Sequence, residues 1–431
     1  MKKDQEVSSM YNIKDYGAIA DGVTINSAAI QAAIDACAAN GGGRVVIPTG
    51  TFKTGTFWLR SNVELHLEMG AILLASDNLD DYNELDAYPQ NYSYTPEEWV
   101  GKHLIIAHEI DNVAITGLGT IDGNGYPFYL DEIFPGAPYW WHTGRAVVKD
   151  KKKLRPGQMI CFIESNHIHV ENITIRNATC WCCFFHGCEY VTIKGLKVYN
   201  PMERLNTDGI DLDCCRYVTV SDCIIDTGDD AIAIRCAEKR LKNPKPCEYI
   251  SVTNCVFAVY ASAIRISVGT GTIRHVRFSN ITVHRGGTMI KLQTSYNGNG
   301  SAKIEDVNFS NFSGTNVKYP INMLSGNGAY IKNITLENIR VEGFGMTDLQ
   351  CDDDGLIDNV TLRNIELRMK DLYDDPLSEE VLAQRGHHCL RIHGVTNSLL
   401  DQVRICDSLS QCPEPVSITD CTNLETRNCN F

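Results

Sequence analysis

The stretch that decides the fold reads Val276-Arg-Phe-Ser-Asn-Ile-Thr-Val, and it is one copy of a phrase that recurs along the 431-residue chain. In each copy, apolar and polar residues alternate on both sides of a central Asn, Asp or Gly. Such alternation predicts short β-strands with one buried face. The other copies begin at Val113, Ile168, Val191, Val218, Ile250, Val307, Ile334 and Val360.

The spacing of the copies predicts a solenoid. Their central residues follow one another at intervals of 23 to 32 residues, a typical repeat length for such folds. The strands have no helices between them, so they cannot be βαβ units, and the spacing of leucine-rich repeats is absent. We therefore expect an all-β parallel β-helix whose central residues occupy bends, where Asn tolerates the turn and can stack in a ladder. These residues are Asn172, Gly195, Asp222, Asn254, Asn280, Asn311, Asn338 and Asn364.

One helix is expected near the N-terminus, as a short cap over the first coils. It opens at Asn26, and its apolar positions Ile30, Ala33, Ile34 and Cys37 share one face. The whole chain, residues 1–431, is predicted to be a single β-helix domain. The expected parts are an N-terminal cap with the first coils (10–75), further coils (104–431), and loop insertions at about 126–155 and 370–388.

The first of these insertions has an unusual composition. It contains Trp140-Trp-His and the basic run from Lys149 to Lys153, among several Pro, Gly and Tyr residues. One interpretation is a surface excursion with a solvated charge run. The other is a wall of a carbohydrate cleft, because aromatic rings pack well on the C–H faces of sugars.

Composition narrows the possible partners and the compartment. A formal net charge of -14 argues against nucleic acid as a partner. No apolar run is long enough for a membrane span, and no signal-peptide pattern follows Met1. Of the 18 cysteines, Cys223, Cys255 and Cys429 lie at apolar positions of strand-like runs, and the one C-x-x-C, at Cys180, has no second pair at zinc-ribbon spacing. We expect reduced thiols, no cofactor and a cytoplasmic location, or a secreted or periplasmic one if a leader has been removed. The oligomeric state is not determined.

Two acidic turns stand about one coil apart. Asp208 belongs to Asn206-Thr-Asp-Gly-Ile-Asp, and the pair Asp229 and Asp230 belongs to Thr227-Gly-Asp-Asp. Neighbouring coils are about 4.8 Å apart, so the three carboxylates are expected to face each other and to repel. Glycoside hydrolysis needs such a group, with one carboxylic acid and one carboxylate that activates water. Ordinary Asp-Gly turns and a calcium site that includes Asp211 and Asp213 are the alternatives.

At these residues the chain resembles glycoside hydrolase family 28, the polygalacturonase-like enzymes. The resemblance runs from Asp15-Tyr-Gly-Ala-Ile-Ala-Asp-Gly to about Gln293 and includes Gly119-Thr-Ile-Asp-Gly and Arg155-Pro. The early motifs occur in many pectin-acting β-helices, whereas the two acidic motifs at one-coil spacing are specific. The resemblance implies a right-handed β-helix and inverting hydrolysis without a metal.

The resemblance also implies a role for each matching residue. Asp229 would be the general acid, while Asp208 and Asp230 would hold and activate the water. Asn206 would position its neighbours. His186 is similar to a cleft-facing His of bacterial members and is a candidate for substrate binding, although a lone His is otherwise more often structural.

The expected substrate-binding residues depart from the family pattern. Ser262 stands where the family has a His, and Met289 replaces the Arg of Arg-Ile-Lys, while Lys291 is kept. In polygalacturonases these basic residues contact the carboxylate of the substrate. Arg265 or Arg235 could supply the lost charge, so Ser262, Arg265 and Lys291 are further candidates for substrate binding.

The sequence thus predicts an inverting glycoside hydrolase that cleaves pectic, galacturonate-containing oligosaccharides or polysaccharides. It would resemble polygalacturonases or exo-galacturonidases and act on imported fragments. Family members that act on rhamnogalacturonan also lack the His, so another pectic linkage is the first alternative. A polysaccharide lyase or a carbohydrate-binding β-helix is the alternative of another class.

Overall fold

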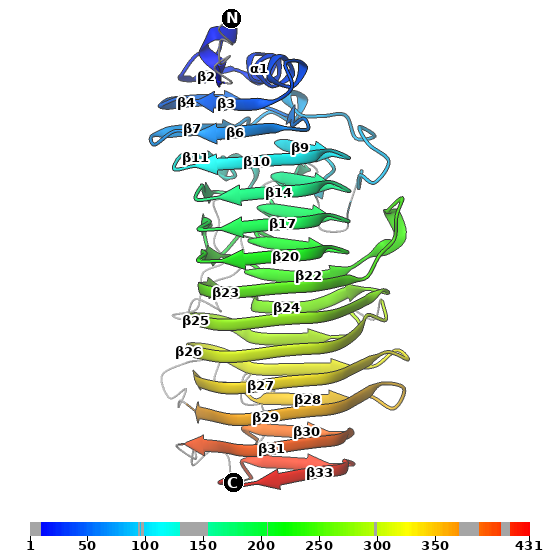
Figure 1. Ribbon diagram of the computed structural model, residues 1–431. Coiled ribbons are helices and arrows are strands. Elements are labelled where there is room, and N and C mark those ends of the chain that lie inside the picture. Colours follow the sequence, from blue (N-terminus) through cyan, green and yellow to red (C-terminus); the bar gives the residue numbers. More distant parts are fainter. Residues whose placement is uncertain are drawn as a thin grey trace, which may run out of the picture.

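The protein forms a long stack of coils that runs from the N-terminus at one end to the C-terminus at the other (Figure 1). The structure is a computed structural model and describes residues 10–93, 95, 99–129, 154–204, 206–296, 300–369, 388–406 and 414–431. Every strand pair among them is parallel, and neighbouring strands in space come from successive coils. The fold is a right-handed parallel β-helix, which confirms the prediction.

Three strand ladders run the length of the stack. The first sheet, which carries the acidic residues, consists of β5 (Phe57–Trp58), β9 (Ile105–His108), β13 (Ile160–Ile163), β16 (Cys183–His186), β19 (Ile210–Asp213), β22 (Ile232–Cys236), β24 (Ser262–Gly269), the last parts of β25 (Thr272–Gln293) and β26 (Lys303–Ser325), β28 (Thr347–Cys351), β30 (Leu390–His393) and β32 (Val416–Thr419).

The second sheet carries the repeated phrase up to its central bend. It consists of β1 (Met10–Asn12), β3 (Gly43–Ile47), β6 (Val63–Leu67), β10 (Asp111–Gly117), β14 (Asn166–Glu171), β17 (Glu189–Lys194), β20 (Arg216–Ser221), the first parts of β23 (Cys247–Val259), β25 and β26, then β27 (Tyr330–Gly343), β29 (Leu356–Met369), β31 (Val395–Cys406) and β33 (Thr422–Arg427).

The third sheet follows the bend and passes into the long strands from β23 onward. Its separate strands are β2 (Asp21–Ile25), β4 (Gly50–Thr54), β7 (Ala71–Ala75), β11 (Thr120–Asp122), β15 (Thr174–Arg176), β18 (Lys197–Tyr199) and β21 (Ile224–Thr227). Outside the coils, β8 (Trp99–Val100) pairs with β12 (Arg155–Pro156). The short 3-10 helices are η1 (Ile13–Tyr16), η2 (Leu79–Asp81), η3 (Tyr126–Phe128) and η4 (Glu238–Arg240).

The bends between the second and third sheets form the expected ladder. All eight predicted bend residues have left-handed backbone conformations, with φ between 51° and 64°. From Asp222 to Asn364 each side-chain amide donates to the side chain one coil before it, as in Asn311 Nδ2 to Asn280 Oδ1 at 3.1 Å. Gly195 interrupts the row because a Cβ there would lie 2.4 Å from Asn172 Oδ1.

The interior of the stack is apolar, and its side chains lie above one another from coil to coil. Phe162 stacks on Phe185 with ring centroids 4.9 Å apart, and Phe278 stacks on Phe309 at 5.1 Å. This core fixes the register, because a shift by one residue would turn the apolar side chains outward. The register in turn fixes which polar side chains meet on the outer faces.

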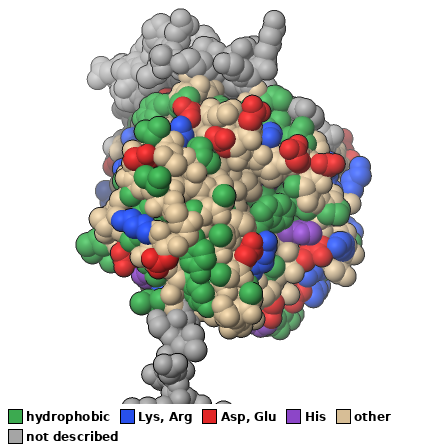
Figure 2. Space-filling view, turned by 90° about the horizontal axis from the view of Figure 1, so that it is seen from above, with side chains coloured by type: hydrophobic (Ala, Val, Ile, Leu, Met, Phe, Trp, Pro, Cys, Tyr) green, Lys and Arg blue, Asp and Glu red, His purple; other side chains and the backbone are tan. Residues whose placement is uncertain are grey.

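Helix α1 (Ser27–Ala39) lies over the first coil and buries the predicted face of Ile30, Ala33, Ile34 and Cys37. Asn26 precedes the helix, but its side chain bonds to the carbonyls of Thr24 and Lys53 instead of capping it. Seen from this end, charged and apolar side chains are mixed on the surface (Figure 2).

Two further findings concern membrane-spanning helices and the two predicted loops. No helix in the described part of the chain has the length and apolarity that a membrane crossing needs. The predicted loops at 126–155 and 370–388 fall mostly on residues 130–153 and 370–387, outside the described residues. Trp140, Trp141, His142 and the lysine run are among them.

Candidate active site

The two acidic turns meet on the first sheet. Asp208 lies just before β19 and Asp230 just before β22, and these strands pair in register with Ile210 opposite Ile232. Carboxylate oxygens of Asp208, Asp229 and Asp230 lie within 4.8 Å of one another. The three residues are only 6%, 7% and 2% exposed. The interval in the sequence therefore becomes a cluster in space, as expected.

The glycines of both motifs are needed because the turns pack tightly. A Cβ on Gly228 would lie 2.2 Å from the carbonyl oxygen of Arg204, and one on Gly209 would lie 2.6 Å from that of Ala231. The turns are also joined by a hydrogen bond from Gly228 N to Thr207 Oγ1 at 3.0 Å. The residue types around the aspartates thus serve to bring the two turns together.

Each of two carboxylates has an oriented donor. Asp230 accepts from Ser262 N at 2.8 Å and from Arg265 Nη1 at 3.0 Å. Asp229 Oδ2 accepts from Asn206 N at 3.2 Å. The structure therefore places Asn206, Ser262 and Arg265 at the carboxylates. Ser262 is buried, and its backbone amide contacts the cluster directly.

Arg155 is a site residue that reasoning about chemistry from the sequence missed. It is fully buried, and its Nη2 donates to Asn206 Oδ1 at 2.7 Å. Its guanidinium also lies over the ring of Tyr129, 5.8 Å from the centroid. Arg155 thus fixes Asn206, which contacts Asp229. The only signal in the sequence was the Arg155-Pro pair after the long insertion.

Two cations lie beside the carboxylates. Arg265 and Lys291 are register partners on β24 and β25, and both project outward from the first sheet. The Asp230 carboxylate raises the pKa of Arg265, although burial opposes this. Burial and the neighbouring Arg265 lower the pKa of Lys291. The Arg265 guanidinium also lies 4.4 Å from the centroid of the Tyr296 ring, so Tyr296 forms part of the same surface.

Arg235 belongs to a separate pair of acids. Its Nη1 lies 3.4 Å from Asp211 Oδ1 and its Nε lies 3.8 Å from Asp213 Oδ2. Burial raises the pKa of Asp211, while Arg235 acts in the opposite direction. Of the two arginines considered for the lost charge, Arg265 therefore lies at the predicted catalytic carboxylates, and Arg235 is engaged elsewhere.

His186 lies apart from the three carboxylates. Its side chain is fully buried on β16 and groups with Asp213 and Cys214. Its Nε2 is 3.3 Å from the carbonyl oxygen of Ala237. The structure does not bring His186 to the candidate catalytic residues, and its contact with a substrate stays a prediction.

Among the residues that the structure describes, two side-chain groups have the ligand types that a metal needs: the three carboxylates, and His186 with Asp213 and Cys214. In each group an arginine already provides positive charge, Arg265 in the first and Arg235 in the second. A cation would have to compete with that guanidinium. The calcium alternative, which includes Asp211 and Asp213, is therefore weakened by Arg235, which contacts both of these carboxylates.

The N-terminal part of the first sheet is covered on its outer face. Outward residues such as Ile106, Ile163 and Phe184 form an apolar cluster with Tyr88, Trp99 and Trp181. The covering segment is anchored by the buried His103, whose Nε2 lies 2.9 Å from Tyr88 Oη and whose Nδ1 lies 2.9 Å from the carbonyl of Gln158. The carboxylates thus lie next to a closed end of the sheet.

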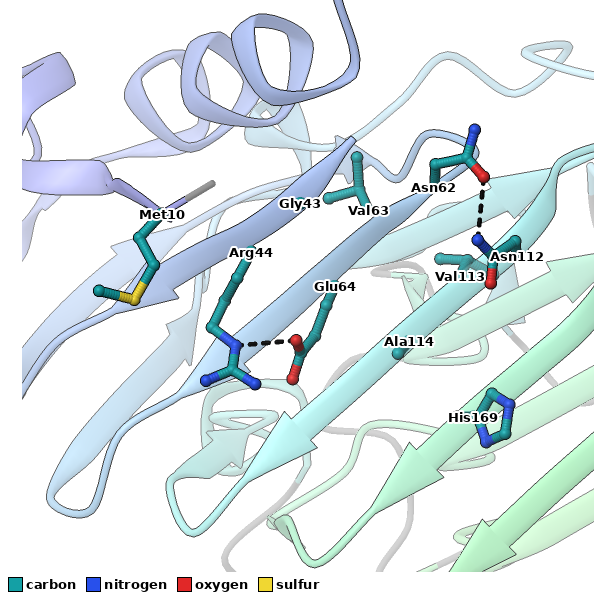
Figure 3. A pocket seen from close by; sticks show the side chains of 10 residues that line it. All are labelled: Met10, Gly43, Arg44, Asn62, Val63, Glu64, Asn112, Val113, Ala114 and His169. Carbon is teal, nitrogen blue, oxygen red and sulfur yellow. Dashed lines mark hydrogen bonds and ion pairs between the residues drawn. The ribbon is translucent and has the colours of Figure 1, made fainter. Parts of the chain in front are cut away.

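A separate hollow of about 400 Å³ lies on the second sheet near the N-terminus (Figure 3). Its charged residues pair with each other, with Arg44 Nε 2.8 Å from Glu64 Oε2. Asn112 donates to Asn62 as part of a bend ladder. This hollow contains none of the candidate site residues, and its polar groups serve the coil stack.

Comparison with known proteins identifies relatives. The model of the family described as glycosyl hydrolases family 28 matches residues 37–259, a range that contains the three carboxylates and excludes Ser262, Arg265 and Lys291. A probable polygalacturonase of Vitis vinifera is 28% identical over 306 residues, which cover 68% of this chain. An exo-poly-alpha-D-galacturonosidase of Dickeya chrysanthemi is 31% identical over 257 residues, or 52% of this chain.

These matches span 58% and 42% of the two relatives' own lengths. Among solved structures, a family 28 exopolygalacturonase of Yersinia enterocolitica superposes with a TM-score of 0.74 at 23% identity. The superposition covers 96% of this chain and 78% of that one. At this identity the structural likeness concerns the fold.

Proposed function

The chain belongs to glycosyl hydrolases family 28, and from this membership we propose that it hydrolyses glycosidic bonds of galacturonate-containing pectic oligosaccharides. The observation that carries the proposal is the cluster of Asp208, Asp229 and Asp230, whose oxygens lie within 4.8 Å beside two cations. Three carboxylates this close repel one another when all are ionised, which favours a proton on one of them. A group that holds one proton and two negative charges has the composition that hydrolysis requires.

In the proposed mechanism Asp229 donates its proton to the glycosidic oxygen as the bond to the anomeric carbon breaks. Asp208 and Asp230 hold a water and accept its proton as its oxygen attacks the opposite face of that carbon. Asn206, held by Arg155, keeps Asp229 in place, and Arg265 orients Asp230.

The stereochemistry is a separate part of the proposal. Carboxyl groups of inverting enzymes are usually about 6.5–9.5 Å apart, to leave room for a water between acid and base. The closest oxygens here are nearer, and we attribute this to two carboxylates that share one water. Proton NMR of the first-formed anomer tests the point: inversion gives the opposite anomer, and retention would contradict the proposed roles.

The cations support an acidic sugar at the cleaved bond. Lys291 makes no hydrogen bond or ion pair with another residue in the described part of the chain, and Arg265 lies next to it. A carboxylate bound there would gain charge-assisted hydrogen bonds. This contact replaces what the family His and Arg would provide.

We further propose exo action, because the covered end of the first sheet limits how far a chain can extend past the carboxylates. The Dickeya and Yersinia relatives carry exo-acting names, which agrees with this. Digestion of an intact polymer should release only short products from the outset. Random internal cleavage would contradict exo action and leave the hydrolytic proposal intact.

The test of hydrolysis itself is the release of new reducing ends from defined oligogalacturonides, without the ultraviolet-absorbing products of a lyase. Asp229→Asn should slow the release by about 10²- to 10⁴-fold. A carbohydrate-binding protein would release no product with either aspartate or asparagine at 229.

A hydrolase of another pectic linkage is the second candidate, favoured by Ser262 and Met289 in place of the family His and Arg. Rhamnogalacturonan fragments assayed in parallel separate the two. The cytoplasmic location stays a prediction.

A further inference from the structure

A second polar pocket lies on the first sheet, beyond the carboxylates toward the C-terminus. Its volume is about 290 Å³, and its polar lining includes Gln293, Asn322, Asp348, Gln350 and Asp352. Pockets for small ligands begin at about this size. The space suits a single sugar ring.

The register places this pocket in line with the candidate active site. Arg265, Lys291, Asn322 and Asp348 follow one another as partners on β24, β25, β26 and β28. Four strand steps separate the β22 coil of Asp230 from β28. At about 4.8 Å for each step, the distance is roughly 19 Å. An oligosaccharide of a few rings, laid along the sheet from the carboxylates, would reach the pocket.

The charges of the pocket differ from those at the carboxylates. Arg391 donates to both oxygens of Asp348, at 2.9 and 2.6 Å, and also to Gln350 Oε1 at 2.9 Å. Its guanidinium is therefore engaged, while Asp352 adds a second negative charge to the lining. A sugar carboxylate placed here would meet net negative charge and be repelled.

The remaining polar groups suit hydroxyl groups. The amide of Asn322 lines the pocket, is partly exposed and offers both a donor and an acceptor. Gln350 is already held by Arg391 and Asp352, at 2.9 and 3.4 Å. An uncharged ring with several hydroxyls suits the Asn322 amide, which can pair with hydroxyls as donor and as acceptor.

We propose that this pocket binds an uncharged sugar residue of the substrate, such as a methyl-esterified galacturonate or a neutral pyranose, on the far side of the cleaved bond from the covered end. This inference rests on the proposed hydrolase function. It makes the enzyme selective for fragments that are acidic at the cleaved bond and neutral a few rings away.

The first experiment measures affinity by calorimetry with the inactive Asp229→Asn protein. The ligands are oligogalacturonides of equal length, one fully de-esterified and one methyl-esterified near the end that would reach the pocket. We expect the esterified ligand to bind about tenfold more tightly, since the removed repulsion has this size. Adding Asn322→Ala should weaken the binding of both ligands, because the Asn322 amide lines the pocket.

The second experiment reverses the preference. Asp348→Asn keeps the shape of the side chain but leaves Arg391 without its carboxylate, so the de-esterified ligand should now bind at least as tightly as the esterified one. Glu366→Gln is the matched control, because Glu366 pairs with Arg368 at 2.7 Å on a different sheet. This control should leave the preference unchanged.

Equal affinities for the two ligands, or a preference that Asp348→Asn does not alter, would overturn the inference. Hydrolysis of a short oligogalacturonide by the unaltered protein is measured alongside. If the short substrate is cleaved and the affinities are equal, only the neutral-sugar pocket is wrong. If it is neither cleaved nor bound, the proposed function fails and the inference fails with it.

Discussion

Two of the places on the first sheet that carry outward-facing aspartates differ in what surrounds them. Before β19 and β22, Asp208, Asp229 and Asp230 share one small volume. On β28, Asp348 stands alone and is paired on both oxygens with Arg391. The backbone is nearly the same in both places, since each is a rung of the same parallel ladder.

The difference shows how a regular scaffold separates chemistry from binding. Crowded carboxylates are costly and favour a shared proton, which suits acid and base catalysis. A carboxylate paired with arginine serves to orient amide and guanidinium donors. Asp230 and Asp348 each contact an arginine on the next rung, so the number of carboxylates that share the volume decides between these outcomes.

The largest expected effect comes from removing the acid at the crowded end. Asp229→Asn should lower kcat by about 10²- to 10⁴-fold, because a general acid contributes this much. The measurement is the rate of reducing-end release at saturating substrate, with circular dichroism to verify folding. The control is Glu366→Gln on another sheet, and a comparable loss there would mean that the assay reports stability instead of chemistry.

The next-largest effect comes from Lys291, the lysine that lies beside the three carboxylates. Lys291→Ala should raise KM for an acidic oligosaccharide about 10- to 100-fold, since a hydrogen bond to a charged group contributes about 1.5–3 kcal/mol. Lys332, which lies over the ring of Tyr330, provides the control variant Lys332→Ala.

The same lysine predicts a pH dependence. The pKa of Lys291 is lowered, so its charge is lost, as pH rises, at a lower pH than the usual value of 10.5. KM for acidic substrates should therefore rise with pH earlier than an ordinary lysine would cause, and Lys291→Arg should suppress the rise. If KM still rises with pH in Lys291→Arg, the titration of another group causes the rise.

A smaller effect, on stability, distinguishes the covered end from the open one. Burial lowers the pKa of His103 from 6.5 to about 4. The folded state thus favours the neutral ring, and this stabilisation is complete above pH 6.5 and is lost as pH falls toward 4. Linkage sets the loss at about 3 kcal/mol. Urea unfolding at pH 7 and pH 4.5 measures how much the free energy of unfolding decreases between the two pH values. The decrease should be smaller for His103→Gln than for the unaltered protein. For the control variant His393→Gln, at a half-exposed histidine, the decrease should equal that of the unaltered protein.

The smallest effect concerns the row of bend residues, which supports both places on the first sheet in the same way. Asn311 has φ of 59° and bonds to Asn280 and Asn338. Asn311→Ala should cost about 1–2 kcal/mol of unfolding free energy through the left-handed backbone. Asn311→Gly, which tolerates that backbone, should cost less. Equal losses would place the effect in the ladder hydrogen bonds alone.

Much of the fold could be predicted because its signals are local and repeated. The bend positions from Asn172 to Asn364 and the helix face of Ile30 and Cys37 were identifiable from period and residue type. Of the candidate active site, only the cluster of Asp208, Asp229 and Asp230 was predictable, because the two motifs that carry these residues lie one coil apart. Arg155 and Tyr296 reach the site from other coils at irregular intervals, so no periodicity points to them.

The sequence by itself determined the coil stack and the meeting of Asp208 with Asp229 and Asp230, since the repeat length sets which residues share a rung. The tertiary structure decided which cation serves which acid: Arg265 lies at Asp230 and Arg235 lies at Asp211, although both follow the acidic motifs closely. It also decided that one end of the sheet is covered and that the other carries a polar pocket lined by amides and aspartates. The physical reason is that side-chain partners across rungs depend on register and on which residues project outward, and these follow from the packing of the apolar core.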